Sequence, residues 1–332
     1  MHGALAPLTW TRAVTTWRFA PVTTALLIAA LLLYLAGVLA VRRWPVARTA
    51  SFTAGLGIVA AAVMGSPGVY GDGGLFWVHM IQHLMLIMIA PWLLCYGHPV
   101  TLLLRATDGI AHDRVQAILR SPAAAMVCSP ITGLALYMAV LFGVHLSSFM
   151  DAMMGSPALM VLEHVLYLGA GYLYFSAILT VDSPARPPGY PIRLFGLFMG
   201  MSADTIVGIV LLQATRPPFP TYARMHPPWG PGPLADIHDG GAVMWIGGDG
   251  LMFLMMLLVA AAWVLDRSPQ AARAGGFLEA ARQAALAGTG HASAGDRAAR
   301  EHLRASADVD ADEAALDAYN ALLARMNQRE ER

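Results

Sequence analysis

Two histidines four residues apart open one of the most apolar stretches of the sequence. His79 and His83 begin the segment "HMIQHLMLIMIAPWLLC", residues 79–95. On a helix both imidazoles would share one face, about 6 Å apart along the axis. Ionisable groups within a membrane span normally face the bundle interior or a cavity, and imidazole is the commonest metal ligand. The pair therefore predicts a buried metal site, with packing or hydrogen bonding as the alternative.

Histidines and methionines from other segments extend this candidate site. The predicted metal ligands are His79, His83, His145, His164, Met160, Met244 and His238. Imidazole and thioether form a soft, neutral donor set, which suits copper, and Cu(I) in particular, better than it suits calcium or magnesium. The predicted partners that orient these imidazoles through hydrogen bonds are Glu163, Asp151, Asp236 and Asp239.

The composition is typical of a membrane protein. Of the 332 residues, 57% are hydrophobic and 13% are charged, whereas soluble domains carry about 25% charged residues. The net charge is zero, so no nucleic-acid partner is indicated. The sequence contains no lysine, which excludes a lysine nucleophile or Schiff base. Two cysteines, Cys95 and Cys128, are too few for a disulfide framework, and we interpret them as small buried hydrophobes.

Seven apolar segments would position the candidate ligands, each near the roughly 20 residues that a membrane-spanning helix needs. They cover residues 19–41, 48–65, 75–96, 122–146, 157–180, 191–214 and 237–265. The first is too long for a cleaved signal peptide and no cleavage site follows it, so we interpret it as a retained helix. The predicted fold class is all-α: a polytopic integral membrane protein with seven transmembrane helices. The proline-rich segment 215–236 is expected to form a loop over the bundle rather than a helix.

The placement of arginine predicts the orientation in the membrane. With seven spans, four arginines fall on the face of the N-terminus and seventeen on the opposite face. The excess of basic residues on cytoplasmic faces then puts the N-terminus outside and the C-terminus in the cytoplasm. In this orientation His79, His83, His145 and His164 lie in the outer part of the membrane, and Met80 belongs to the same layer.

The C-terminal part of the chain differs in composition. Residues 1–267 form the predicted seven-helix transmembrane domain, and residues 268–332 form a cytoplasmic tail rich in Ala, Arg, Asp and Glu. An amphipathic helix that docks on membrane lipid or on a partner is one interpretation of the tail, and a partly disordered, solvated segment is the other. The apolar stripe of that helix would consist of Leu316, Tyr319, Leu323 and Met326.

Two acidic residues fall in the middle of predicted spans. Asp204 lies in the sixth segment and Asp249 in the seventh. Acids at such positions are costly and face the protein interior. We favour a structural polar role for both over a role in relaying protons.

The histidine-bearing segments resemble the CtaG-type membrane proteins implicated in the assembly of caa-type cytochrome c oxidases. The resemblance is carried by residues 79–105, by "VHLSSFMDAMMGSPALMVLEHVLYL" at 144–168, by "LADIHDGGAVMWIGGDG" at 234–250, and by the seven-span plan. It implies a bacterial plasma (inner) membrane protein that supplies copper to the external copper centre of a respiratory oxidase. The implied partners are a cytochrome c oxidase subunit or another copper chaperone.

The sequence departs from that family pattern at three places. Ser147 and Ser148 stand where a proline usually follows the histidine of the fourth span. Met160 occupies a position where the family often has a histidine, which keeps a soft ligand and puts an all-histidine site in doubt. His238 replaces a different polar residue.

Four functions from different classes follow from these residues. The first is a non-enzymatic, copper-binding assembly factor that hands Cu(I) to a partner. The second is a copper transporter or tolerance protein, with Met85, Met88 and Cys95 continuing down the helix. The third is an intramembrane zinc hydrolase with Glu163 or Asp239 as general base. The fourth is a haem-b electron carrier with paired histidines. We favour the first.

Overall fold

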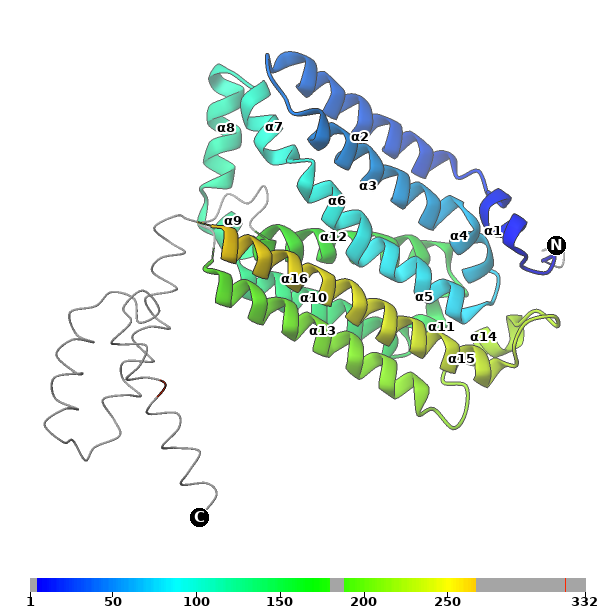
Figure 1. Ribbon diagram of the computed structural model, residues 1–332. Helices are drawn as coiled ribbons and strands as arrows, with labels where there is room; N and C mark the ends of the chain where they lie inside the picture. Colours follow the sequence, from blue (N-terminus) through cyan, green and yellow to red (C-terminus); the bar gives the residue numbers. More distant parts are fainter. Residues whose placement is uncertain (1–4, 180–187, 267–319, 321–332) are drawn as a thin grey trace, which may run out of the picture. The chain divides into compact units, whose positions relative to one another are not determined.

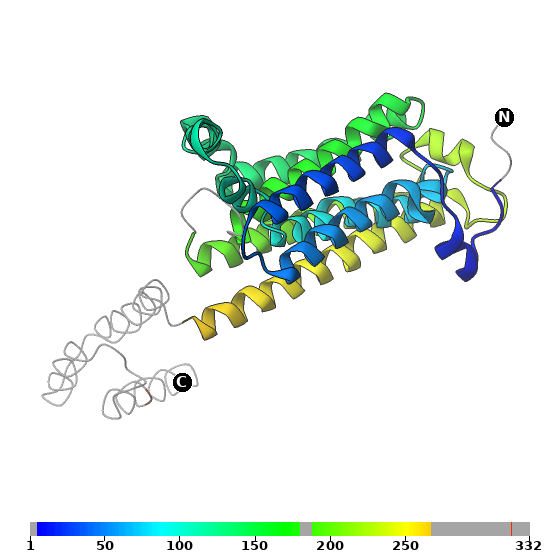
Figure 2. The same cartoon turned by 90° about the horizontal axis from the view of Figure 1, so that it is seen from above.

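The computed structural model describes residues 5–179, 188–266 and 320, and within these ranges the chain forms helices and turns without a strand (Figures 1 and 2). The all-α prediction is confirmed. In chain order the helices are α1 (Trp10–Thr15), α2 (Pro21–Ala40), α3 (Val46–Met64), α4 (Ser66–Gly71), α5 (Phe76–Leu84), the π-helical turn η1 (Met85–Ile89), α6 (Ala90–Tyr96), α7 (Pro99–Ala106), α8 (Gly109–Leu119), α9 (Pro122–Val127), α10 (Pro130–His145), α11 (Phe149–Met153), α12 (Pro157–Leu179), α13 (Tyr190–Leu212), α14 (Pro220–Met225), α15 (Pro233–Ala242), the π-helical turn η2 (Val243–Gly247) and α16 (Gly248–Leu265).

Among the described residues, six helical segments are long and apolar enough to cross a membrane. They are Pro21–Ala40, Val46–Gly71, Phe76–Ala106, Pro157–Leu179, Tyr190–Leu212 and Pro233–Leu265. These segments make the chain a multi-pass membrane protein. The remaining predicted span corresponds to α10, an apolar helix of 16 residues, which is about 24 Å long and shorter than a typical span. The seventh span and the orientation therefore stay predictions.

The predicted fourth span, 122–146, is wrong as one continuous helix. The chain breaks at Cys128 and Ser129 and starts again as α10. The break has a local cause, because Pro130 lacks the N–H that a continuing helix would use. The Ser129 hydroxyl then accepts a hydrogen bond from the Thr132 N–H at 3.1 Å, which caps the new helix.

The predicted loop 215–236 is also wrong in part, because it contains the short helix α14 and the start of α15. Both helices carry proline in their first turn, Pro220 and Pro233. Proline is favoured there because its ring fixes a helical φ and the missing N–H would be unpaired in any case. The prolines thus start helices here as well as interrupting them.

The segment formed by α5, η1 and α6 lies at the centre of the packing, against α3, α4, α12 and α15. Its π-helical turn precedes Pro91, which cannot donate to the Ile87 carbonyl four residues back. Helix α12 approaches at this point through Gly171, where a Cβ atom would overlap that carbonyl oxygen. This close approach seats α12 beside the histidine-bearing helix.

One end of the helical unit holds the histidine-bearing part of α5. Figure 1 shows α4, α5, α11, α14 and α15 at the same end as α1, with α7 and α8 at the opposite end, and the view from above in Figure 2 agrees. The contacts of α15 and α4 with α5, and of α11 with α12 and α14, bring these elements together. The candidate site therefore lies near one end of the bundle.

The chain divides into two compact units. The first comprises Met1–Pro188 with Ile192–Val259, and the second comprises Gly189–Pro191 with Ala260–Arg332. Within the second, the Tyr190 hydroxyl donates to Asp266 Oδ2 at 2.8 Å and its ring stacks on Trp263. The stripe Leu316 to Met326 and nearly all of the predicted tail lie outside the described residues. The predicted boundary at 267/268 stays a prediction.

Candidate metal site

Helix α5 is held at its first turn by an acid from α15. Asp236 accepts hydrogen bonds from the backbone N–H of Phe76 at 2.8 Å and of Trp77 at 2.9 Å. These N–H groups have no partner within a helix, so a buried carboxylate satisfies them. Asp236 was predicted to orient an imidazole directly. It acts instead on the backbone, where it fixes the helix that carries His79 and His83.

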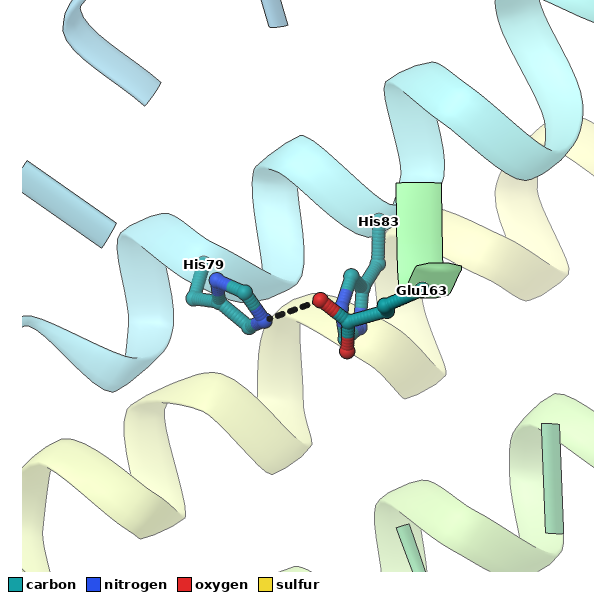
Figure 3. A group of neighbouring side chains, drawn as sticks. All are labelled: His79, His83 and Glu163. Atoms are coloured by element: carbon teal, nitrogen blue, oxygen red, sulfur yellow. Dashed lines mark hydrogen bonds and ion pairs between the residues drawn. The ribbon is translucent and has the colours of Figure 1, made fainter. Parts of the chain in front are cut away.

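His79, His83 and Glu163 form the core of the site, and all three side chains are fully buried. Glu163 comes from α12 and its carboxylate lies between the two imidazoles of α5 (Figure 3). Its Oε1 is 3.0 Å from His83 Nε2 and its Oε2 is 3.5 Å from His79 Nε2. Metal–ligand bonds of about 2.0–2.1 Å span both separations. The three side chains can therefore share one ion.

His145, at the end of α10, extends this core from the other side of His83. Its Nε2 lies 3.2 Å from His83 Nδ1 and 3.4 Å from the sulfur of Met80. Its Nδ1 lies 2.9 Å from the Leu141 carbonyl, which can only accept, so Nδ1 carries the proton. His145 Nε2 is thereby left with a bare lone pair directed into the cluster.

Tyr167 holds the rings of His83 and His145. Its ring lies against His83 with centroids 4.2 Å apart, and its hydroxyl is 3.2 Å from His145 Nδ1. The tyrosine is fully buried on α12, one turn beyond Glu163. Such neighbours fix the orientation and the tautomer of ligating imidazoles.

Unpaired polar atoms gather around the cluster. Among the described residues, seven buried side-chain atoms lack a hydrogen-bond partner, and six of them belong to this end: Asp72 Oδ1, both ring nitrogens of His79, Gln82 Oε1, Glu163 Oε2 and the Tyr222 hydroxyl. Two of the six, His79 Nε2 and Glu163 Oε2, face each other as an ion pair 3.5 Å apart, which is longer than an ordinary hydrogen bond. Buried polar groups are nearly always paired, and an unpaired one costs about 1–3 kcal/mol. A concentration of them is the pattern expected where a bound ion supplies the missing interactions.

Helix α14 covers the cluster. Tyr222 places its ring 5.8 Å from the His79 ring and 5.4 Å from Phe76. The backbone N–H of Thr221 donates to Asp151 at 2.6 Å. Asp151 was predicted to orient an imidazole, but its hydrogen bond holds helix α14 in place. Burial raises the pKa of the Tyr222 phenol well above its usual range, with the charge of Glu163 as the second cause. The phenol therefore stays neutral over the cluster at physiological pH.

The other predicted histidine ligands, His164 and His238, lie outside the group formed by His79, His83 and Glu163. His164 is partly buried and accepts a hydrogen bond from the Gln82 amide at 3.0 Å. His238 Nε2 lies 2.9 Å from the carbonyl oxygen of Ala214, in the connection between α13 and α14. Met160 is half-buried on α12, and Met244 is buried in η2. Asp239 is exposed.

Several residues of the site escaped the sequence analysis. Met80 was placed in the correct layer without a role, although its spacing of three residues from His83 on one helix could have assigned it. Gln82 was given no role, and Tyr167 and Tyr222 gave no comparable signal, because local spacing does not reveal which side chains meet across the fold. Glu163 was predicted to orient imidazoles, whereas its two oxygens face the same nitrogens that a metal would use.

The fold and the site define a multi-pass helical membrane protein with a buried histidine and carboxylate cluster near one end of its bundle. Residues 32–266 match the family described as cytochrome c oxidase caa3 assembly factor (Caa3_CtaG). This match covers more than half of the chain, so the protein belongs to that family. The resemblance stated from the sequence is confirmed.

Similar proteins occur in mycobacteria. An uncharacterized protein of Mycobacterium bovis and one of Mycobacterium tuberculosis are each 29% identical over 334 residues, which covers 97% of this chain and 46% of theirs. An uncharacterized protein of Mycobacterium leprae is 29% identical over 266 residues, covering 76% of this chain and 40% of its own. The chain thus spans less than half the length of these relatives. No solved structure matches it.

Proposed function

We propose that this protein binds Cu(I) at His79, His83 and Glu163 and supplies it to cytochrome c oxidase during assembly. One observation carries the proposal: the three side chains converge, fully buried, with ring nitrogens and a carboxylate oxygen that find no hydrogen-bond partner among the described residues. Membership of the assembly-factor family supplies the process in which such a site would act.

The charge of the cluster favours a monovalent ion. Glu163 provides one negative charge, and two neutral imidazoles add none. Asp72, the nearby acid, is already paired with Arg18 at 2.6 Å. A net charge buried away from water is costly, so one bound Cu(I) leaves the site neutral, whereas Zn²⁺ or Cu²⁺ leaves an excess positive charge. Imidazole is a ligand that copper accepts readily.

Delivery to a partner requires a way out of the buried site, and α14 provides it. The helix is six residues long and is followed by the segment 226–232 before α15 begins. It contacts the cluster through Tyr222 and is tied to α11 by the bond between Thr221 and Asp151. Release of that single bond and of the aromatic contacts would expose His79.

A second candidate, passage of copper through the membrane, is favoured by one feature. Met88 and Cys95 are fully buried further along the same segment, in η1 and α6, and could offer sulfur ligands below the cluster. A transporter would change the copper content of cells. An assembly factor would change the copper content of the oxidase.

The proposal is tested in a bacterial host whose oxidase matures only when this protein is produced. Membranes are assayed for oxidase activity and for copper in the purified oxidase, with wild type, His79→Ala/His83→Ala, and His238→Ala as the matched control. We expect loss of oxidase copper in the double variant alone, with cellular copper unchanged. A double variant that matures oxidase normally contradicts the proposal, and a fall in cellular copper supports transport instead.

A further inference from the structure

The two ring nitrogens of His83 face different groups. Nε2 points to Glu163 at 3.0 Å, and Nδ1 points to His145 Nε2 at 3.2 Å. A neutral imidazole carries one proton, so one of the two nitrogens must be bare. Both neighbours, the carboxylate and the bare His145 Nε2, are acceptors. A neutral His83 can therefore satisfy only one of them with its proton, and the other contact, between two acceptors, needs either a second proton on His83 or a bound metal ion.

On the His145 side, the contact also includes a sulfur atom. Met80 Sδ lies 3.4 Å from His145 Nε2, and a thioether has no proton to donate. His145 Nε2 thus faces two atoms, and the sulfur cannot form a hydrogen bond with it while Nδ1 keeps the proton for the Leu141 carbonyl. All three side chains are buried, namely Met80, His83 and His145, so bulk water does not lie between them.

These separations suit a single ion. With bonds of about 2.0–2.1 Å to nitrogen and about 2.3 Å to sulfur, the distances of 3.2 and 3.4 Å correspond to angles close to tetrahedral. Two imidazoles and a thioether are softer than the set that contains Glu163, and soft ligands select Cu(I).

We infer that His83 Nδ1, His145 Nε2 and Met80 Sδ form a second Cu(I) position, next to the first and alternating with it. The inference rests on the proposed function and deepens it. His83 belongs to both positions through different nitrogens, so copper passes from one side of a single imidazole to the other.

The proton of His83 makes the two positions exclusive. Copper at the first position takes Nε2, and the Nδ1–H then donates to His145. Copper at the second position takes Nδ1, and the Nε2–H donates to Glu163, which is the usual carboxylate partner of a ligating imidazole. Passage breaks the bonds of copper to His79, His83 Nε2 and Glu163 and forms bonds to His83 Nδ1, His145 and Met80. The proton moves from Nδ1 to Nε2, and copper stays Cu(I).

The charge of the site also limits it to one copper. Glu163 balances a single positive charge, and the second position adds neutral ligands only. Two copper ions would leave one positive charge unbalanced in a buried setting. Full loading is therefore expected at one copper per chain, shared between two ligand sets.

The test uses the full chain, purified in detergent and loaded with Cu(I). Copper per chain is measured by elemental analysis, and sulfur ligation by X-ray absorption at the copper edge. The variants are His79→Ala, which removes a ligand of the first position and keeps the Glu163 charge, and Met80→Leu, which removes the sulfur with little change of volume. Met255→Leu is the matched control, a buried methionine of α16 to which no copper role is assigned.

We expect one copper per chain in every case. Wild type and Met255→Leu show partial sulfur ligation, His79→Ala shows a full sulfur ligand, and Met80→Leu shows none. Two coppers per chain, loss of all copper in a folded His79→Ala variant that keeps Met80, His83 and His145, or no sulfur in any protein overturns the second position. In the last case copper that still depends on His79 leaves the proposed function intact, whereas a chain that binds no copper overturns both.

Discussion

Two groups of buried polar side chains differ in how far the protein satisfies them. In the middle of the bundle, both oxygens of Asp204 accept from the Tyr137 hydroxyl, at 3.1 and 3.4 Å, and Gly248 packs directly on the carboxylate. Near the end of the bundle, His79 has two buried nitrogens without a hydrogen-bond partner among the described residues. Neighbouring side chains satisfy the hydrogen bonds of the first group, whereas the second group keeps buried donors and acceptors that a bound ion could satisfy.

The neighbouring acid shows that the distinction is one of degree. Asp249 accepts from the Thr205 hydroxyl at 2.7 Å, and its other oxygen is the single buried unpaired atom outside the histidine end in the described part of the chain. One unpaired oxygen is within the ordinary range for a protein. Six atoms at one end of the bundle exceed that range, although two of them, His79 Nε2 and Glu163 Oε2, face each other as an ion pair at 3.5 Å. Burial of a polar group is thus weaker evidence for function than burial with unmet hydrogen bonds.

The largest expected effect comes from separating the two helices that form the histidine cluster. Gly171→Ala places a Cβ against the Ile87 carbonyl, and backbone rather than a flexible side chain must move. We expect a loss of about 3 kcal/mol in stability and the loss of copper binding, since Glu163 moves with α12. Thermal unfolding and copper per chain are the measurements.

Gly169→Ala is the matched control for that substitution, because nothing lies within 4 Å of its Cβ position. It should leave the melting temperature and copper binding at wild-type values, or raise stability slightly. Equal behaviour of the two alanine variants would show that the seating of α12 does not form the site.

Asp204→Ala tests most directly whether the two polar groups act independently. Asp204→Ala leaves the Tyr137 hydroxyl without its partner in a fully buried place, which should cost about 1–3 kcal/mol of stability. Copper per chain should not change, because this carboxylate is closed by its own neighbours. Copper loss in a variant that still folds would mean that the two groups act together.

Asp236 tests whether the first turn of α5 positions the histidines. Asp236→Ala removes the acceptor for Phe76 and Trp77 N–H, with an expected cost of about 0.5–2 kcal/mol. Copper affinity should fall on the order of 10-fold, as for other groups that orient ligands. Asp236→Asn keeps one acceptor for the two N–H groups and should restore only part of both, and Asp239→Ala, at an exposed side chain, should change neither. A chelator competition in which Asp236→Ala binds like wild type would rule out this positioning role.

The smallest effect is expected at Tyr222. Its hydroxyl is buried without a partner among the described residues, so Tyr222→Phe should leave stability at pH 7 unchanged within about 0.5 kcal/mol or raise it. Because the pKa of this phenol is raised in the folded protein, its contribution is present below about pH 10, the value for an unfolded tyrosine, and is lost as the pH rises further. The fall in stability above pH 10 should therefore be shallower in Tyr222→Phe. An identical pH profile would contradict this account.

Much of the fold was predictable, because apolar length and proline position act locally. The spans that contain α2, α3, α5, α12, α13 and α16 were found from their composition. The interruption at Ser129 and Pro130 was missed because the flanking residues are apolar enough to hide it. The signal was nevertheless present, since a serine before a proline is a common helix start.

The parts of the site that come from one helix were predictable, but the contacts between different helices were not. The spacing of His79 and His83 predicts that they share a face, and the structure brings them together. Which side chain meets them depends on the close approach at Gly171 and on the proline at 91, which a reading of periodicity does not reveal. Glu163 therefore changed from an orienting group to a candidate ligand, whereas His238 was drawn to a backbone carbonyl.

The central claim is that the histidine end of the bundle binds copper and the buried Asp204–Tyr137 group does not. Its most direct test is copper per chain in the reduced, detergent-purified protein, comparing His79→Ala/His83→Ala with Asp204→Ala. The account predicts one copper per chain in wild type and in Asp204→Ala, and none in the double histidine variant. Copper retained by a folded double variant, or a wild-type protein that binds none, would contradict it.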